Sequence, residues 1–464
     1  MAIVLRDYQD QIISDVRSLM SQGHRTLLIV SPTGSGKTAL TAHMLKSAAA
    51  KGLSSWFICH RRELIYQSSR AFTSIDVDHG IVCAGVPPAP QKLVQVCSIQ
   101  TLANRLSKIP KPRLIIYDEC QHMGATTWER VYRENPQAFH IGLTASPTRL
   151  DGRGLGDFFS HMIKGPSVSS LIERNFLSEY KAFAPAVVNT ESLHTRMGDF
   201  IKSELSDLMN RPTVTGSAIH EYKRNAMGKR NIVFCSSILH SETVVASFNA
   251  AGIPARHVDG ETPHNEREES LRLFQEGKIL VLSNVDLFGE GLDIPSVEAV
   301  TLLRPTQSLC LHIQQIGRAL RPSPGKTHAI ILDQAGNIER HGLPDEEREW
   351  NLDGVVHVKS GQREPSVKIC STCFAAQKSG PPKCIYCGSE FRIKPRKIKQ
   401  QDGELGEINK DELIASRKAK RQEQGRAETL SDLIAIGKSR GYKNAYAWAK
   451  YTFNGRQRKK VYGS

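Results

Sequence analysis

The fold class is decided by residues 31–38, which read Ser31-Pro32-Thr33-Gly34-Ser35-Gly36-Lys37-Thr38 in a chain of 464 residues. They follow an apolar run at 26–30, which predicts a buried strand, and precede residues 39–45, which predict a helix. A strand, a glycine-rich turn and a helix in this order form the context of a phosphate-binding loop. We therefore expect an α/β fold that binds a nucleotide at this turn.

The loop residues have distinct expected roles at such a site. The glycines let the backbone curl so that N–H groups and the positive end of the helix face phosphate oxygens. Lys37 is expected to reach the β- and γ-phosphates of ATP, and the Thr38 hydroxyl to bind Mg²⁺. The nucleotide-binding residues expected in this loop are Thr33, Gly34, Ser35, Gly36, Lys37 and Thr38. The alternative is an ordinary glycine turn before a surface lysine.

An acidic pair, Asp118-Glu119, directly follows the apolar run at 114–117. A parallel α/β sheet presents its ligand groups at the carboxyl ends of its strands. We therefore expect Asp118 to bind Mg²⁺ through water, and Glu119 to orient and polarise the water that attacks ATP. The hydroxyl-bearing segment Thr144-Ala145-Ser146 follows another apolar run, at 139–143, and is placed to sense the acidic pair.

The positive charge of the chain is concentrated near its C-terminus. Residues 361–464 hold 23 of the 62 Lys and Arg residues and 10 of the 47 Asp and Glu residues, a net charge of +13. The first 360 residues hold the other 39 and 37, a net charge of +2. Because a uniformly solvated surface would spread its charge, we expect the C-terminal region to bind a polyanion.

The cysteines divide into six single residues and one cluster. The single ones lie mostly in apolar runs and are expected to be reduced core residues. Cys370-x-x-Cys373, ten residues and Cys384-x-x-Cys387 have the spacing of a four-thiolate structural Zn²⁺ site. Disulfides are the alternative, and they are disfavoured if the protein is cytoplasmic. Charge close to Met1 and the lack of a long apolar run predict a cytoplasmic protein without a membrane partner.

Over roughly residues 1–340, these segments resemble the motor core of superfamily 2 helicases and translocases. Residues 31–38 resemble motif I, residues 118–122 (Asp-Glu-Cys-Gln-His) resemble motif II, and residues 144–146 resemble motif III. Two departures stand out. Ser31 replaces the usual alanine or glycine, and motif II is neither Asp-Glu-Ala-Asp nor Asp-Glu-Ala-His, which weakens an assignment to the RNA-helicase branches.

The resemblance implies further contacts in the N-terminal half. Arg6 and Gln9 match the element that reads adenine ahead of motif I, and a glutamine can pair with adenine N6 and N7. Arg62 and Thr101 fall where the family contacts the nucleic-acid backbone, and basic or hydroxyl side chains suit such contacts. Ordinary loop polarity is the alternative for these two residues.

Residues 314–321, Gln-x-x-Gly-Arg-x-x-Arg, resemble motif VI. Two arginines three positions apart on a helix share a face, and the resemblance implies that Arg318 and Arg321 act as arginine fingers beside Gln314. Residues 289–293 resemble motif V, which implies that Gly291 and Asp293 approach the nucleotide, Asp293 at the ribose. Gln314 stands where many RNA helicases have histidine, which favours a DNA translocase.

The resemblance implies two RecA-like parallel-sheet motor domains in tandem that bind ATP and Mg²⁺ in a cleft between them. We expect motor domain 1 at 1–165, a connecting segment at 166–225 and motor domain 2 at 226–345. The four-cysteine zinc-binding module should span 365–392, followed by a basic, mainly helical tail at 393–464 that binds nucleic acid. The alternative for the tail is a small helical cap that packs on the motor. Motor, zinc module and tail together are similar to phage-type helicases and RadD-like DNA-repair ATPases.

The predicted function is that of an ATP-dependent DNA helicase or translocase. Its nucleic-acid substrate would be single-stranded, forked or branched DNA, and a replication or repair protein is the expected protein partner. Two alternatives stay open. One is a DNA-stimulated ATPase that remodels DNA-bound partners without unwinding, and the other is an RNA helicase.

Overall fold

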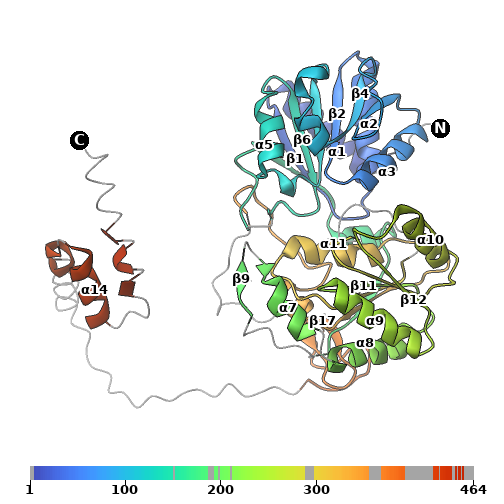
Figure 1. Cartoon of the computed structure of the whole chain (residues 1–464), viewed down its shortest axis with the longest axis vertical. Coiled ribbons are helices and arrows are strands. Elements are labelled where there is room, and N and C mark those ends of the chain that lie inside the picture. Colours follow the sequence, from blue (N-terminus) through green and yellow to red (C-terminus); the bar gives the residue numbers. More distant parts are fainter. Residues whose placement is uncertain are drawn as a thin grey trace. The chain divides into compact units, whose positions relative to one another are not determined.

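A computed structural model describes residues 5–149, 152–185, 193–196, 199–209, 212–287, 297–354, 367–391, 422–427, 429–440, 445–446, 448–450 and 452–453. Contacts between residues divide the chain near residue 392 into a large unit and a small C-terminal unit, which are described separately. The large unit contains two parallel-sheet domains, as the sequence predicts (Figure 1).

The sheet of the first domain has seven strands in the order β3-β4-β2-β5-β6-β1-β7, all parallel. These strands are β1 (Thr26–Val30), β2 (Ser55–Cys59), β3 (His79–Val82), β4 (Val94–Ser98), β5 (Leu114–Asp118), β6 (Phe139–Thr144) and β7 (His161–Lys164). The central strands are buried on both faces, which explains why they are continuous apolar runs in the sequence.

Two apolar clusters cover the two faces of this sheet, and residues along each strand alternate between them. One face packs against α1 (Asp7–Ser21), α2 (Lys37–Ala50) and α3 (Arg62–Thr73). The other packs against α4 (Ile99–Ala103) and α5 (Thr126–Arg133). The short 3-10 helices η1 (Leu106–Lys108) and η2 (Cys120–His122) complete this domain.

The sheet of the second domain has eight strands in the order β12-β13-β11-β14-β15-β8-β17-β16. The first six are parallel, and β17 and β16 continue the sheet in antiparallel pairing. These strands are β8 (Tyr180–Phe183), β11 (Asn231–Phe234), β12 (Ala255–Val258), β13 (Val281–Asn284), β14 (Ala299–Leu302), β15 (Ala329–Asp333), β16 (Val367–Ile369) and β17 (Ala375–Lys378).

The helices of the second domain lie on both faces of its sheet. They are α9 (Ile238–Ala250), α10 (His264–Gln275), α11 (Leu309–Ala319) and α12 (Asn337–His341). The connecting segment contributes to the same domain, because β8 joins its sheet and α8 (Pro212–Asn225) packs with α9. The other elements of this segment are α6 (Val168–Glu173), β9 (Thr195–Arg196), β10 (Asp199–Phe200) and α7 (Lys202–Met209).

The zinc-binding module predicted at 365–392 is attached to the second domain through backbone pairing. Its strand β17 pairs with β8, and Ala184 N–H donates to the Phe374 carbonyl at 2.9 Å. The four-cysteine hairpin is therefore an edge of the motor sheet.

The C-terminal unit contains α14 (Leu430–Ser439) and helical residues between 445 and 453. A Cβ on Gly437 would lie 3.0 Å from the Ala445 Cβ, so this glycine lets the two helices approach closely. Leu433 and Ala449 are fully buried there, with Trp448 and Phe453 packed beside them. The basic runs at 392–399 and 456–460 lie outside the described residues.

The six single cysteines are buried and form no disulfide among the described residues, which confirms that they are core residues. Burial raises the pKa of the Cys97 and Cys120 thiols well above the ordinary value, and that makes them unreactive. Within the described part of the chain, no helix combines the length and the apolar character needed to span a bilayer.

Candidate functional site

The phosphate-binding loop lies between β1 and α2, as predicted. Gly34 and Gly36 have φ values of 85° and 81°, a left-handed conformation that favours glycine. The Lys37 ammonium folds back over the loop and donates to the Ser31 carbonyl at 3.2 Å. The Ser31 hydroxyl donates to Ser35 Oγ at 2.7 Å, so the unusual serine is accommodated inside the loop.

The start of α1 lies against this loop. Arg6 is the N-cap, and its N–H donates to Gln9 Oε1 at 2.9 Å. Gln9, 3% exposed, donates through Nε2 to the Gly36 carbonyl at 3.1 Å, and the Tyr8 hydroxyl donates to the Ser35 carbonyl at 2.7 Å. The predicted adenine-reading residues are therefore held directly beside the phosphate-binding loop.

The connecting segment adds to this group an aromatic ring that was not predicted from the sequence. The Arg6 guanidinium lies 4.2 Å from the centre of the Phe176 ring, a cation–π contact. The Tyr8 ring meets Phe176 edge to face at 5.8 Å. Nothing in the local sequence marks Phe176, because it comes from another part of the chain.

The acidic pair lies at the carboxyl end of β5. Glu119 adopts a left-handed φ of 52° and is only 6% exposed. Such a conformation costs a non-glycine residue about 1–3 kcal/mol and is typical of functional sites. Gln121 Nε2 donates to Glu119 Oε2 at 2.9 Å, and the Thr144 hydroxyl contacts Gln121 Oε1 at 2.8 Å.

This network continues into the second motor domain. Gln314 Nε2, on α11, donates to Glu119 Oε2 at 3.1 Å across the domain boundary. A Cβ on Gly317 would lie 2.8 Å from the Thr33 Cβ, so α11 packs directly against the phosphate-binding loop. Figure 1 shows α11 on the side of the second domain that faces the first. Arg318, one residue further along α11, is 3% exposed. The structure thus brings Gln314 and Gly317 of motor domain 2 to Glu119 and Thr33 of motor domain 1.

The prediction that Arg318 and Arg321 share a helix face is wrong, because α11 ends at Ala319. Residue 321 precedes Pro322, and a residue before proline is disfavoured in the helical conformation. Lys326 Nζ then donates to the carbonyls of Ala319 and Arg321. Burial lowers the pKa of Lys326 to about 8. Arg321 nevertheless stays near the phosphate-binding loop, since its Cγ would lie 3.7 Å from a Cβ on Gly34.

The two predicted backbone-contacting residues lie at the same edge of the first sheet. Arg62 is the first residue of α3, after β2, and Thr101 lies in α4, after the neighbouring strand β4. The Arg62 guanidinium donates to the Tyr66 hydroxyl at 3.2 Å. The contacts of both residues with nucleic acid stay predictions.

Adjacent residues join this edge to the second domain. Arg61 donates to the backbone carbonyls of Asp286 and Leu287 at 2.8 and 3.2 Å. Glu63 accepts from Arg267, an arginine that is 8% exposed. These interdomain contacts were not predicted from the sequence. Gly291 and Asp293, predicted to approach the nucleotide, lie outside the described residues.

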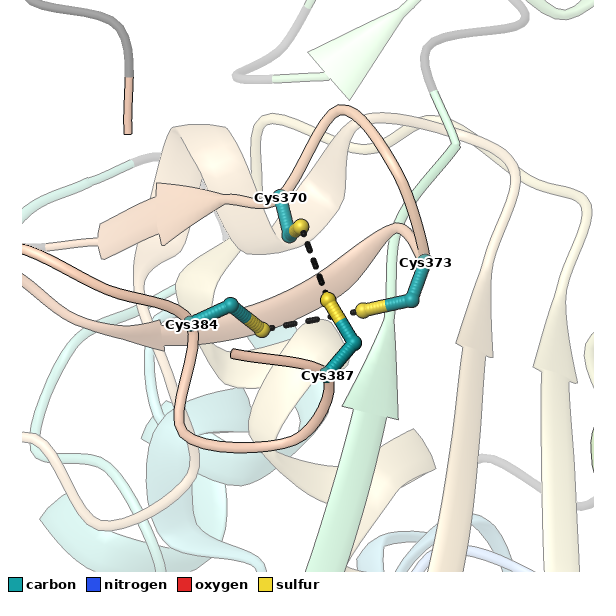
Figure 2. A group of neighbouring side chains, drawn as sticks. All are labelled: Cys370, Cys373, Cys384 and Cys387. Carbon is teal, nitrogen blue, oxygen red and sulfur yellow. Dashed lines mark hydrogen bonds between the residues drawn. The ribbon is translucent and has the colours of Figure 1, made fainter. Parts of the chain in front are cut away.

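Figure 2 shows the four clustered cysteines converging from the β16–β17 hairpin and the turns beside it. Their sulfur atoms lie within 4.8 Å of one another, with Cys370–Cys387 and Cys373–Cys384 separations of 3.6 Å. Tetrahedral Zn²⁺ with bonds of about 2.3 Å separates its sulfur ligands by about 3.8 Å. A contact with Ser389 lowers the pKa of the Cys387 thiol to about 6, which favours the metal-binding thiolate. The cluster fits a structural Zn²⁺ ion.

Comparison with known protein families gives two matches along the chain. Residues 2–149 match the family "Type III restriction enzyme, res subunit". Residues 215–323 match the family "Helicase conserved C-terminal domain". The two matches cover the loop, acidic pair and α11 described above.

Individual proteins are also similar to this chain. The chain is 34% identical over 389 residues to a 51.5 kDa protein of a Lactococcus phage, covering 83% of each chain. It is 32% identical over 370 residues to the putative mitochondrial ATP-dependent helicase irc3 of Schizosaccharomyces pombe, covering 74% of this chain and 59% of that protein. A fragment of a putative HsdR subunit of a type I restriction enzyme from Vibrio vulnificus shares the fold, with a TM-score of 0.59, 22% identity, and coverage of 73% of this chain and 67% of that one.

Proposed function

Since this chain belongs to the superfamily 2 helicases, we propose that it is an ATP-driven motor that moves on or unwinds DNA. Membership makes it a nucleic-acid-dependent ATPase with two RecA-like domains. We propose that this nucleic acid is DNA. We also propose the roles of individual residues and the action of the motor on DNA.

One observation carries the proposal: the hydrogen bond from Gln314 in motor domain 2 to Glu119 in motor domain 1. Both side chains are buried, 2% and 6% exposed, so the bond forms away from bulk water. A carboxylate that orients the attacking water is thus held by a residue of the other domain. The ATPase site is complete only when the two domains are together.

The remaining site residues divide the chemistry between the domains. In motor domain 1, Lys37 and Thr38 bind the ATP phosphates and Mg²⁺, Asp118 binds Mg²⁺ through water, and Glu119 orients the attacking water. In motor domain 2, Arg318 and Arg321 neutralise the charge that develops on the γ-phosphate. We assign adenine recognition to Arg6, Gln9 and the Phe176 ring, on the basis of their position beside the loop.

This division converts a chemical step into motion. ATP contacts both domains and favours their closed arrangement, and loss of the γ-phosphate removes the contacts that hold them together. Arg62 and Thr101 lie at one sheet edge of motor domain 1, beside the Arg61 contact with motor domain 2. A strand bound along this edge would therefore be gripped differently in the two arrangements.

Two observations favour DNA over RNA as the track. The N-terminal match is to a restriction-enzyme subunit family, whose name is that of DNA-cleaving enzymes. Gln314 also begins the motif at 314–321, where many RNA helicases have histidine. The net charge of +13 in residues 361–464 supports a polyanion contact by the C-terminal tail, without distinguishing DNA from RNA.

We assign Zn²⁺ to Cys370, Cys373, Cys384 and Cys387, where four protein ligands leave no open coordination position. The ion would contribute folding free energy to a hairpin whose own core is small. Because β17 pairs with β8, the ion would also hold the edge of the motor domain 2 sheet in place.

The proposal is tested by measuring ATP turnover with no polymer, single-stranded DNA, forked duplex DNA and matched RNA. We expect single-stranded or forked DNA to stimulate turnover more strongly than RNA does. Equal or greater stimulation by RNA would contradict the choice of DNA. Absence of stimulation by every polymer would contradict a nucleic-acid motor. Displacement of a labelled strand from forked DNA then separates unwinding from translocation or partner remodelling.

A further inference from the structure

Residues 343–354, here called the strap, follow α12 in motor domain 2 and return to motor domain 1. Leu343, at the start of the strap, is buried in the core of motor domain 2. Trp350 and Leu352, near its end, pack against the core of motor domain 1. The strap therefore joins the two domains a second time, after the connecting segment at 166–225.

The first half of the strap is held in a fixed shape. Arg348 donates to the carbonyls of His341 and Leu343 at 2.9 and 3.1 Å through one guanidinium nitrogen. Its other terminal nitrogen donates to the Glu346 carbonyl at 3.1 Å. The Arg348 guanidinium thus donates hydrogen bonds to three backbone carbonyls. These bonds restrain the backbone of the first half of the strap, so that this half can transmit a displacement.

The second half forms backbone contacts with the loop that follows motif III. Gly156 N–H donates to the Leu352 carbonyl at 2.8 Å, and Arg153 forms an antiparallel bridge with Gly354. A Cβ on Gly154 would lie 2.0 Å from the Leu352 carbonyl oxygen, so the two backbones can cross only with glycine at this position. Such a close crossing leaves the loop little freedom to move without the strap.

This loop begins at the hydrogen-bond network of the ATPase site. The Thr144 hydroxyl contacts the Gln121 side chain, which in turn donates to Glu119. Ser146 N–H donates to Thr144 Oγ1 at 3.1 Å, at the start of the loop. Further along, the Arg149 guanidinium occupies the space where Gly124, after motif II, would carry a Cβ. The strap thus contacts a loop whose other end supports Glu119.

The strap also contacts the zinc-binding hairpin. Asp345 accepts a hydrogen bond from the Tyr180 hydroxyl of β8 and forms an ion pair with Lys378 at 2.8 Å. Lys378 is the last residue of β17, the strand between the two cysteine pairs. One carboxylate therefore ties the strap to both strands at the edge where the zinc-binding hairpin joins the motor sheet.

We propose that the strap couples the loop after motif III in motor domain 1 to the zinc-binding hairpin of motor domain 2. Trp350, Leu352 and Gly154 are positioning residues that hold the strap against the loop after motif III, and Asp345 transmits the displacement to the hairpin. The inference rests on the proposed function, since it assigns the strap a part in stimulation by nucleic acid. Two sites joined in this way bias one another's state in both directions.

The test compares three single substitutions in the full-length, zinc-loaded protein. Gly154→Ala forces the strap away from the loop, and Trp350→Ala removes its apolar contact with motor domain 1. Glu349→Ala, an exposed neighbour on the strap, is the matched control. We expect the first two variants to keep basal ATP turnover but lose about tenfold of the DNA-stimulated turnover and of the strand displaced per ATP. Stimulation and displacement equal to the control would overturn the proposal.

Hydrogen exchange on the unaltered protein decides the question if these variants do not fold. Addition of a non-hydrolysable ATP analogue should change the exchange of amides at 153–156, 350–354 and 375–378 together. A change at 153–156 without one in the strap or β17 would refute the coupling. This measurement needs nucleotide but no nucleic acid. It therefore still tests the coupling by the strap if no polymer stimulates wild-type turnover, a result that would contradict the proposed function.

Discussion

Replacing Gln314 with alanine tests whether motor domain 2 helps to position the catalytic carboxylate. The substitution removes the 3.1 Å hydrogen bond from Gln314 Nε2 to Glu119 Oε2 and leaves Gln121 as the other donor to that oxygen. A hydrogen bond to a charged group contributes about 1.5–3 kcal/mol. Since each factor of ten in rate corresponds to about 1.4 kcal/mol, we expect ATP turnover to fall roughly ten- to a hundredfold.

The assay is steady-state ATP turnover at saturating DNA, with nucleotide affinity measured separately. Affinity should change little, because Lys37 and Thr38 are unaltered. Gln315→Ala is the matched control, since Gln315 lies on the same helix and is equally buried, 2% exposed. Its side-chain oxygen has no hydrogen-bond partner within the part of the chain described. Turnover of Gln314→Ala equal to wild type, or no lower than that of Gln315→Ala, would show that Gln314 does not position Glu119.

Three further predictions concern the catalytic carboxylate, the metal and the tail. Glu119→Gln should bind ATP but lose nearly all hydrolysis, because the amide cannot accept a proton from water; turnover near wild type would remove Glu119 from its role. Metal analysis should find about one zinc per chain, and Cys384→Ser should lower both zinc content and the thermal midpoint. A folded wild-type protein without zinc would contradict this assignment. Ending the chain at residue 391 should flatten the salt dependence of DNA binding by about 0.9 per lost phosphate contact, and an unchanged slope would show that the tail is idle.

The sequence predicts the motor strands well because they are buried on both faces. The apolar run at 26–30 coincides with β1, and the runs at 114–117 and 139–143 are confirmed as β5 and β6, each strand ending one residue later than its run. The loop at 31–38 is also predictable from the local sequence, because glycine is needed at its two left-handed positions.

Features that depend on distant parts of the chain could not be predicted in this way. Phe176 packs beside Arg6 although about 170 residues separate them, and β17 joins β8 through pairing that no local pattern encodes. The spacing of motif VI predicts a helix that includes Arg321, but α11 ends at Ala319. The spacing takes no account of Pro322 and of Lys326, which donates to the Arg321 carbonyl. The strap has few apolar residues and no motif, so only its contacts reveal it.

We propose that one ATPase site is built from both motor domains. Arg318→Ala tests it most directly, because this buried residue belongs to motor domain 2 and the nucleotide-binding loop belongs to motor domain 1. The measurement is ATP turnover at saturating DNA together with ATP affinity and the thermal midpoint. We predict retained ATP binding in a folded protein and a loss of about 10³-fold or more in turnover. Turnover within a few fold of wild type would contradict a site shared between the domains.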